Sequence, residues 1–350
     1  MITLPGLIDV HVHLRDMGQE HKEDFFSGTS AALAGGFTTV LDMPNNQLPI
    51  TDYELLTKKQ ETAKLKIVSD VGFHFGSLGD NLDEFEKIKD KVWGLKLYLN
   101  QTTGGYIIDE DRLKKIYRKW HEVTEGKRPV LLHAEEDVMG IVTKVLQDTK
   151  HPTHICHISS IDEFTPIMKA KEKGLPITCG VCPHHLFLTV DDVEKLGSFG
   201  MMKPSLKTKK DQEFFWKHLE YIDLIESDHA PHAVEEKKSS NPPFGVPGLE
   251  TTLPLLLTAV YEKRLKLQDI IDKCYENPRK IFHLPKQENT HIEISNIKYQ
   301  ISNSALHTKC GWSPFDGWEV RGKVMKVVLR GETVFENDKV LAQPGSGHVI

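Results

Sequence analysis

The feature that most constrains the fold is a regular alternation between short apolar runs and amphipathic segments. The segments between most of the runs have a helical period, as in residues 23–36, 111–123 and 136–147. This order is typical of a parallel sheet wrapped by helices. The strand-like runs number eight and span residues 6–12, 37–43, 67–75, 93–99, 129–134, 153–158, 176–181 and 222–227.

The number of runs and their order favour a closed barrel over an open doubly wound sheet. No G-x-G-x-x-G fingerprint follows the first run, as a dinucleotide-binding fold would require. The length of 350 residues suits one barrel with insertions as well as it suits two domains. The sequence therefore predicts an α/β fold, a (β/α)8 barrel of the TIM type.

The last part of the chain has a different pattern. Residues 290–301 and 319–341 alternate apolar and polar positions, which predicts antiparallel strands and hairpins. We expect a barrel over residues 1–285 and a small β-rich subdomain with a C-terminal extension over residues 286–350. The Pro-, Ser- and Gly-rich segment 237–248 is interpreted as a loop inside the barrel.

Composition excludes several classes of protein. A net charge of −6 with interspersed signs gives no basic footprint for nucleic acid. The longest apolar run, residues 253–260, is too short to cross a bilayer, and residues 1–10 do not resemble a signal peptide. Five cysteines argue against a disulfide framework, so we expect a cytoplasmic protein. The C-x-x-C pair of Cys179 and Cys182 is read as two buried strand residues, with redox chemistry or half a zinc site as the alternative.

Polar side chains gather at the ends of the predicted strands, where a barrel of this kind performs its chemistry. His11 and His13 end the first strand, and two positions along a strand point the same way. Together with a carboxylate, these imidazoles predict a Zn²⁺ site. The other residues of this set are Arg15, Asn45, Lys96, His133, His157, His184, His185, Asp228, His229 and His232.

A single histidine on a strand is more often a hydrogen-bonded core residue, and His74 and His154 are read that way. Cys156 is expected to face away from the site, because His157 next to it faces inward on a regular strand. His184 and His185 follow Pro183 and stay as further candidates at the barrel mouth.

Lys96 lies in the middle of a strand with Leu95 and Leu97 on either side, so it points into the barrel. An unpaired buried ammonium group is costly, and desolvation beside metal cations favours the neutral amine of a lysine. A neutral amine can take up CO₂, and the resulting carbamate can bridge two metal ions. The alternative is a lysine that extends to a polar rim.

A bridged metal pair generates hydroxide near neutral pH and polarises a carbonyl group, which is hydrolytic chemistry. Asp228 is placed to take the proton of the attacking water and return it to the departing nitrogen. It can also be a metal ligand at the same time.

Several motifs resemble the amidohydrolase superfamily, in order and over essentially the whole chain. They are PGLIDVHVHLRDMG, DMPNN, GLKLYLN, LLHAEE, HICHIS, PHHLFLT, SDHAPH and NPRKIFHLP. Within it, the sequence is most similar to the dihydroorotases, in particular to the dihydroorotase domains of animal multifunctional pyrimidine-synthesis proteins. H-x-H-L-R and D-H-A-P-H are the most specific of these motifs.

The resemblance implies a role for each matching residue. His11, His13 and Asp228 would hold one zinc ion, His133 and His157 the second, and carboxylated Lys96 with a hydroxide would bridge them. The substrate carboxylate would be bound by Arg15, Asn45 and His232. Thr102 would contact the substrate from the loop of residues 100–106, which would cover the substrate. For Arg15 the alternative is a salt bridge at the rim.

The chain departs from the family pattern in three places. Asp16 and Met17 replace a usual Glu-Pro. Gly180 stands where animal relatives tend to have a glutamate, so an additional zinc site that involves Cys156 would lose a ligand. Lys203 replaces a frequent arginine, and lysine cannot form the same bidentate contact.

The predicted function is reversible cyclisation of N-carbamoyl-L-aspartate to L-dihydroorotate in pyrimidine synthesis. The alternatives are another cyclic amidase (dihydropyrimidinase, hydantoinase or allantoinase) and an inactive scaffold relative. A phosphate-dependent barrel enzyme would need a glycine-rich phosphate loop, which is missing from the sequence. By analogy with the family we expect a homodimer, and association with carbamoyl phosphate synthetase and aspartate transcarbamoylase.

Overall fold

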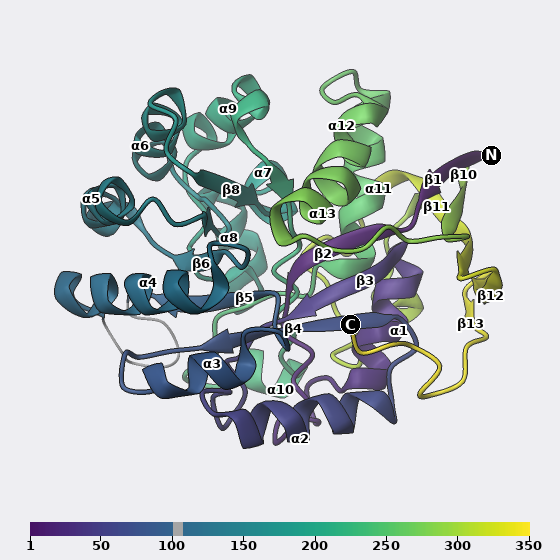
Figure 1. Ribbon diagram of the computed structural model, residues 1–350. Helices are drawn as coiled ribbons and strands as arrows, with labels where there is room; N and C mark the ends of the chain where they lie inside the picture. Colours follow the sequence, from purple (N-terminus) through teal and green to yellow (C-terminus); the bar gives the residue numbers. More distant parts are fainter. Residues whose placement is uncertain (101–107) are drawn as a thin grey trace.

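The computed structural model describes residues 1–100 and 108–350, and its centre is a barrel of eight parallel strands that pair in chain order. Each predicted strand-like run overlaps one of them, so the predicted fold class is confirmed (Figure 1). The strands are β2 (Leu7–Val12), β3 (Phe37–Asp42), β4 (Asp70–Gly76), β5 (Gly94–Tyr98), β6 (Val130–His133), β7 (Thr153–Ile155), β8 (Ile177–Val181) and β9 (Leu224–Ile225).

The barrel closes just beyond the end of its last strand. An isolated parallel bridge joins Val12 to His229, and the His13 main-chain N–H donates to the His229 carbonyl at 2.8 Å. The main-chain N–H of Ser227 donates to Asp9 Oδ2 at 3.0 Å across the same seam. Closure therefore depends on the segment that also contains the predicted site residue Asp228.

Helices surround the barrel, as the alternating pattern predicts (Figure 1). Their bounds are α1 (Phe25–Ala34), α2 (Tyr53–Lys64), α3 (Phe85–Ile88), α4 (Glu110–Thr124), α5 (Met139–Thr149), α6 (Ile161–Glu172), α7 (Pro183–Phe187), α8 (Val190–Leu196), α9 (Lys209–Lys217), α10 (Val234–Lys237), α11 (Leu249–Tyr261), α12 (Leu267–Ile271) and α13 (Asn277–Phe282).

Capping residues determine where four of these helices begin. The side chains of Asp24, Asp52, Asp109 and Ser160 each accept a hydrogen bond from the main-chain N–H three residues further on. Such caps satisfy N–H groups that a helix leaves unpaired at its start. Each of the four follows a barrel strand, so the caps set where the helices after β2, β3, β5 and β7 begin.

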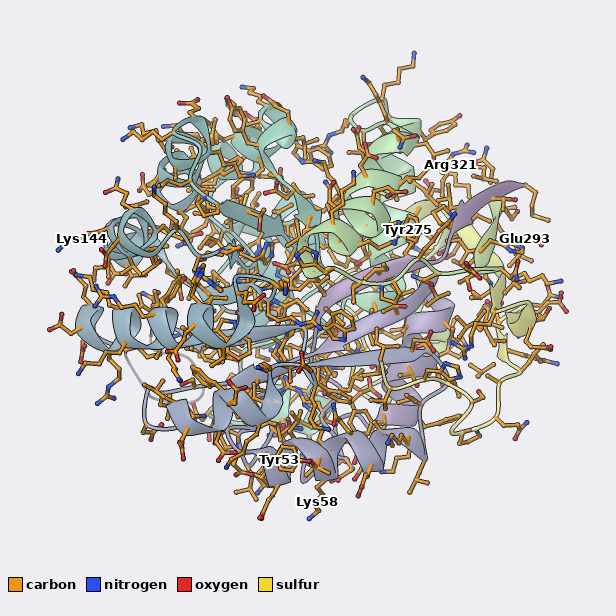
Figure 2. The ribbon with its side chains drawn as sticks, in the orientation of Figure 1. Tyr53, Lys58, Lys144, Tyr275, Glu293 and Arg321 are labelled. Atoms are coloured by element: carbon orange, nitrogen blue, oxygen red, sulfur yellow. The ribbon has the colours of Figure 1, made fainter. Side chains whose placement is uncertain are left out.

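Neighbouring residues of α2 show how the helices face the barrel. Lys58 is exposed and extends outward, as does Lys144 of α5 (Figure 2). Lys59 is buried, and its Nζ lies 2.7 Å from Asp42 Oδ2 and donates to the Met43 carbonyl at 2.8 Å. This ion pair ties α2 to the carboxyl end of β3.

A second sheet of five antiparallel strands lies beside the barrel (Figure 1). Its strands, in spatial order, are β1 (Ile2–Pro5), β10 (His291–Gln300), β11 (Glu319–Leu329), β12 (Glu332–Glu336) and β13 (Lys339–Val340). The antiparallel strands expected near the C-terminus are confirmed. β1, from the other end of the chain, adds the outermost strand to this sheet.

The last residues of the chain pack on the barrel. Val71 of β4 donates its main-chain N–H to the His348 carbonyl at 2.9 Å, and its carbonyl accepts from Ile350 at 3.0 Å. The division into units at residues 285 and 286 stays a prediction. No helix within residues 1–100 and 108–350 is both long and apolar enough for a bilayer crossing.

Candidate active site

A cavity of about 520 Å³ opens at the carboxyl ends of the barrel strands. Every described residue to which the family resemblance gives a role lines this one cavity. These residues are His11, His13, Arg15, Asn45, Lys96, His133, His157, Asp228 and His232. Thr102 lies outside the described residues.

The first group in the cavity joins the start of the barrel to its last strand. Nε2 of His11 and Nε2 of His13 lie 3.3 Å and 3.1 Å from Oδ1 of Asp228. Nδ1–H of His13 donates to Asn45 Oδ1 at 2.6 Å, which leaves the Nε2 lone pair directed at the carboxylate. The imidazole nitrogen and the carboxylate oxygen then both present lone pairs, and they repel each other unless a cation lies between them. This arrangement therefore suits a bound metal ion.

The second group lies at the carboxyl ends of β6 and β7. Nδ1 of His133 and Nε2 of His157 are 3.2 Å apart, and Nε2–H of His133 donates to Glu135 Oε1 at 3.0 Å. The rings of His157 and His11 have centroids 5.0 Å apart, so the two groups meet. Nδ1 of His157 is buried without a hydrogen-bond partner in the described part of the chain.

Lys96 lies on β5, lines the same cavity as both groups and is 1% exposed. Its Nζ donates to Cys156 Sγ at 3.2 Å and lies 5.1 Å from the ring centroid of Tyr98. The prediction that Cys156 faces away from the site is therefore wrong. β7 ends at Ile155 and His157 has a φ of 38°, so the alternation of a regular strand stops before these two residues.

Glu226 is a buried residue of the site that sequence reasoning missed. Its Oε1 accepts from the His157 main-chain N–H at 2.6 Å, and its Oε2 lies 3.6 Å from His11 Nδ1 and 3.5 Å from His154 Nε2. Burial opposes its ionisation, but the neighbouring imidazoles of His11 and His154 outweigh burial and lower its pKa. A carboxylate two residues before Asp228, at the end of the predicted run 222–227, was the signal that could have identified it.

Burial also controls the protonation of the site histidines. It lowers the pKa of His11 to about 4, with the Lys96 charge as the second cause. It holds the pKa of His13 and of His157 well below their usual range. The imidazoles are therefore neutral at pH 7, which is the form that binds metals.

Comparison with known proteins gives a consistent result. Residues 2–287 match the model of the amidohydrolase family. The whole chain is 46% identical to the multifunctional protein CAD of Squalus acanthias, of which it spans only 16%. It is 35% identical over its full length to the dihydroorotase of Pyrococcus furiosus, covering 85% of that protein. The chain belongs to the amidohydrolase family.

Solved structures agree with this assignment. The amidohydrolase superposes on an L-hydantoinase from Arthrobacter aurescens with a TM-score of 0.94, at 24% identity over 99% of this chain and 88% of that chain. At this identity the likeness shows the fold alone. An inactive dihydroorotase-like domain from Chaetomium thermophilum gives a TM-score of 0.85 at 25% identity over 100% of this chain and 99% of that domain.

The cluster of His11, His13 and Asp228 fits the metal site of an amidohydrolase. Each residue offers a ligand atom, and these atoms lie within 4.8 Å of one another. The three side chains are buried and combine imidazole nitrogen with carboxylate oxygen, a set that suits Zn²⁺. His11 also forms a second such group with Cys156 and Glu226.

The other end of the amidohydrolase cavity presents cationic and polar groups. Arg15 Nε donates to the Pro231 carbonyl at 3.2 Å, and its NH2 group lies 3.3 Å from His232 Nε2. His232 Nε2 also lies 2.9 Å from the Phe244 carbonyl, and Lys22 Nζ donates to His232 Nδ1 at 3.2 Å. Burial, followed by the charges of Arg15 and Lys22, lowers the pKa of His232, so this imidazole is neutral.

The remaining histidine candidates lie apart from this cavity lining. His184 and His185 are buried in α7 beside Cys182, and they do not line the described cavity. Cys179 in β8 and Cys182, which directly follows that strand, are both buried with free thiols.

Proposed function

We propose that this amidohydrolase is a zinc-dependent dihydroorotase, which interconverts N-carbamoyl-L-aspartate and L-dihydroorotate in de novo pyrimidine synthesis. The observation that supports it best is the placement of Arg15 and His232 in the same cavity as the histidine and carboxylate cluster. Dihydroorotate has a ring amide for hydrolysis and a carboxylate for recognition. The cavity offers a candidate group for each.

The metal centre of this proposal contains two Zn²⁺ ions. His11, His13 and Asp228 would hold one ion, His133 and His157 the other, and Lys96 would bridge them as N6-carboxylysine together with a hydroxide. Lys96 is buried and lines the same cavity as the two histidine groups, which supports this role. When bound, such a metal pair supplies a nucleophile from water near neutral pH and polarises a carbonyl.

Side chains of the cavity would carry out the proton transfer and bind the substrate. Asp228 takes a proton from the attacking water and returns it to the departing ring nitrogen. The Arg15 guanidinium offers two parallel N–H groups to the substrate carboxylate. Asn45 accepts from His13 through its Oδ1, so its amide nitrogen is the group left to donate to substrate. Thr102 keeps its proposed contact with substrate as part of the covering loop.

Two other functions compete with this one. A dihydropyrimidinase, hydantoinase or allantoinase would use the same metal chemistry on an uncharged ring, for which Arg15 has no partner. A scaffold relative would bind substrate poorly or lack metal. All the residues proposed as ligands of the two zinc ions line the cavity, which argues against a scaffold.

A substrate panel with metal analysis tests the proposal. Purified protein is expected to contain zinc and to hydrolyse dihydroorotate, and to form it from carbamoyl aspartate at lower pH. Dihydrouracil, hydantoin and allantoin should be poor substrates. Zinc-containing protein that turns over one of these rings and not dihydroorotate would replace the assignment by a cyclic amidase. Protein without zinc and without turnover would support the scaffold.

The assembly is a further part of this proposal. We expect a homodimer that works alongside carbamoyl phosphate synthetase and aspartate transcarbamoylase, since the CAD relative is a multifunctional protein. Light scattering on the purified chain gives the molar mass of the assembly and so tests for a homodimer. Co-purification with the two enzymes tests for the association.

A further inference from the structure

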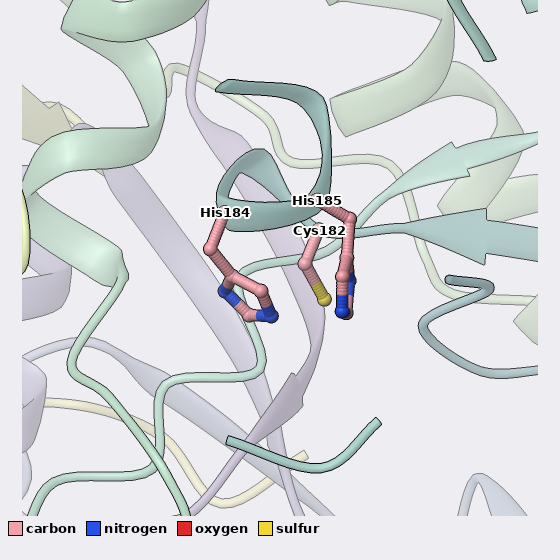
Figure 3. Close-up of side chains that lie close together, drawn as sticks. All are labelled: Cys182, His184 and His185. Atoms are coloured by element: carbon pink, nitrogen blue, oxygen red, sulfur yellow. The ribbon is translucent and has the colours of Figure 1, made fainter. Parts of the chain in front are cut away.

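We propose that Cys182, His184 and His185 form a separate metal site that binds Zn²⁺ through one thiolate and two imidazoles. Cys182 directly follows β8, and the two histidines lie in the first turn of α7. Their ligand atoms lie within 4.8 Å of one another. Figure 3 shows the sulfur of Cys182 directed to the space between the two rings, whose centroids are 4.4 Å apart.

His185 is oriented in the way that a metal-binding histidine requires. Its Nε2–H donates to the Pro204 carbonyl at 3.1 Å. Nδ1 therefore carries the lone pair, and this atom is buried without a hydrogen-bond partner in the described residues. Metal-bound histidines usually donate their other ring N–H to a carbonyl or carboxylate, so the unpartnered nitrogen points to a missing ligand.

The chemistry of the set selects the cation. All three side chains are at most 3% exposed, so hard ions that keep several waters are disfavoured. A thiolate with two imidazoles suits Zn²⁺ among the common divalent ions. Burial lowers the pKa of His184 and His185, so both are neutral, and it raises that of the Cys182 thiol, so Zn²⁺ would displace the thiol proton on binding.

The location of the site gives it a structural role near the cavity. His185 donates a hydrogen bond to the carbonyl of Pro204, and the neighbouring Lys203 lines the candidate active site. A metal ion at this position would fix α7 against the loop that carries Lys203. The alternative is a cluster that binds no metal, in which two neutral histidines pack beside a core cysteine.

Cobalt substitution separates these possibilities without an activity assay. Among the described residues, only two groups of mutually close ligands contain a cysteine: this one, and His11 with Cys156 and Glu226. Whole protein reconstituted with Co²⁺ is compared with Cys182→Ser and with Cys156→Ser as the matched control. The readouts are the sulfur-to-cobalt charge-transfer absorption and the metal content per chain.

The expected result is a charge-transfer band in the wild type that persists in Cys156→Ser and disappears in Cys182→Ser, with the loss of one metal ion per chain. His185→Gln should lower the metal content in the same way. A wild type without the band, or a band that depends on Cys156 and persists without Cys182, would overturn the site. If Cys182→Ser does not fold, the folded Cys156→Ser protein decides: a sulfur ligand in its X-ray absorption spectrum supports the site, and its absence refutes it.

Discussion

A Cβ atom at Gly180 would lie 2.4 Å from Oε1 of Glu226. The carboxylate of Glu226 therefore occupies the space that any side chain at position 180 would need. Position 180 is the place where the sequence comparison expected a lost ligand. The structure shows that a carboxylate from β9's end fills that space and contacts the His157 main chain.

Gly180→Ala should therefore disturb the site from outside the cavity. The methyl group must displace Glu226, and overpacking of this kind costs about 1–3 kcal/mol of stability. We expect lower metal content and at least about tenfold lower turnover, because Glu226 lies beside His11 and His157. Gly140→Ala in α5 is the matched control, since nothing lies within 4 Å of the added atom. Equal behaviour of the two variants in metal analysis and activity would contradict this prediction.

Lys96→Ala should remove the proposed bridge between the metal ions. Loss of several kcal/mol of transition-state stabilisation corresponds to a decrease in kcat of about a thousandfold. Short carboxylic acids such as propionate should restore part of the activity and of the metal content. Lys59→Met is the control for loss of a buried lysine, because Lys59 pairs with Asp42 and should give no response to propionate. A Lys96→Arg protein with near-normal activity would exclude a carbamate.

Arg15→Ala tests recognition of the substrate carboxylate. Removing a charge-assisted pair costs about 1.5–3 kcal/mol, so kcat/KM for dihydroorotate should fall about 10- to 100-fold. Arg15→Lys should recover only part of it, since lysine lacks the planar fork. Any residual hydrolysis of hydantoin, which has no carboxylate, should be unchanged. Equal losses on both substrates would mean that Arg15 supports the fold and does not bind substrate.

His151 gives a prediction for stability against pH that is independent of the cavity. Its Nε2 lies 3.0 Å from the Arg128 carbonyl, and burial lowers its pKa from 6.5 to about 4. The unfolded chain therefore binds one more proton here between these values, so stability falls as the pH decreases through this range. Between pH 7 and 5 the contribution is about 2 kcal/mol. Urea unfolding measures the free energy of unfolding at each pH. Between pH 7 and 5, His151→Gln should lose less of this free energy than the wild type, by the amount given above. An equal pH dependence in the two proteins would contradict the prediction.

The sequence was sufficient for the barrel because each strand shows its pattern locally. It was not sufficient where a single backbone angle decides which way a side chain points. Cys156 and His157 both reach the interior because β7 ends early and His157 has a positive φ, and no residue type signals this. Glu226 was missed because its role depends on the room that Gly180, far away in the chain, leaves for its carboxylate.

The pairing of β1 with β10 couples the two ends of the chain, since Ile2 lies opposite Ile294. During synthesis on a ribosome, β1 must wait until β10 has emerged before it finds its partner. Contacts between such distant segments form slowly. β1 therefore remains an unpaired edge until then, and it is a segment for a chaperone to shield.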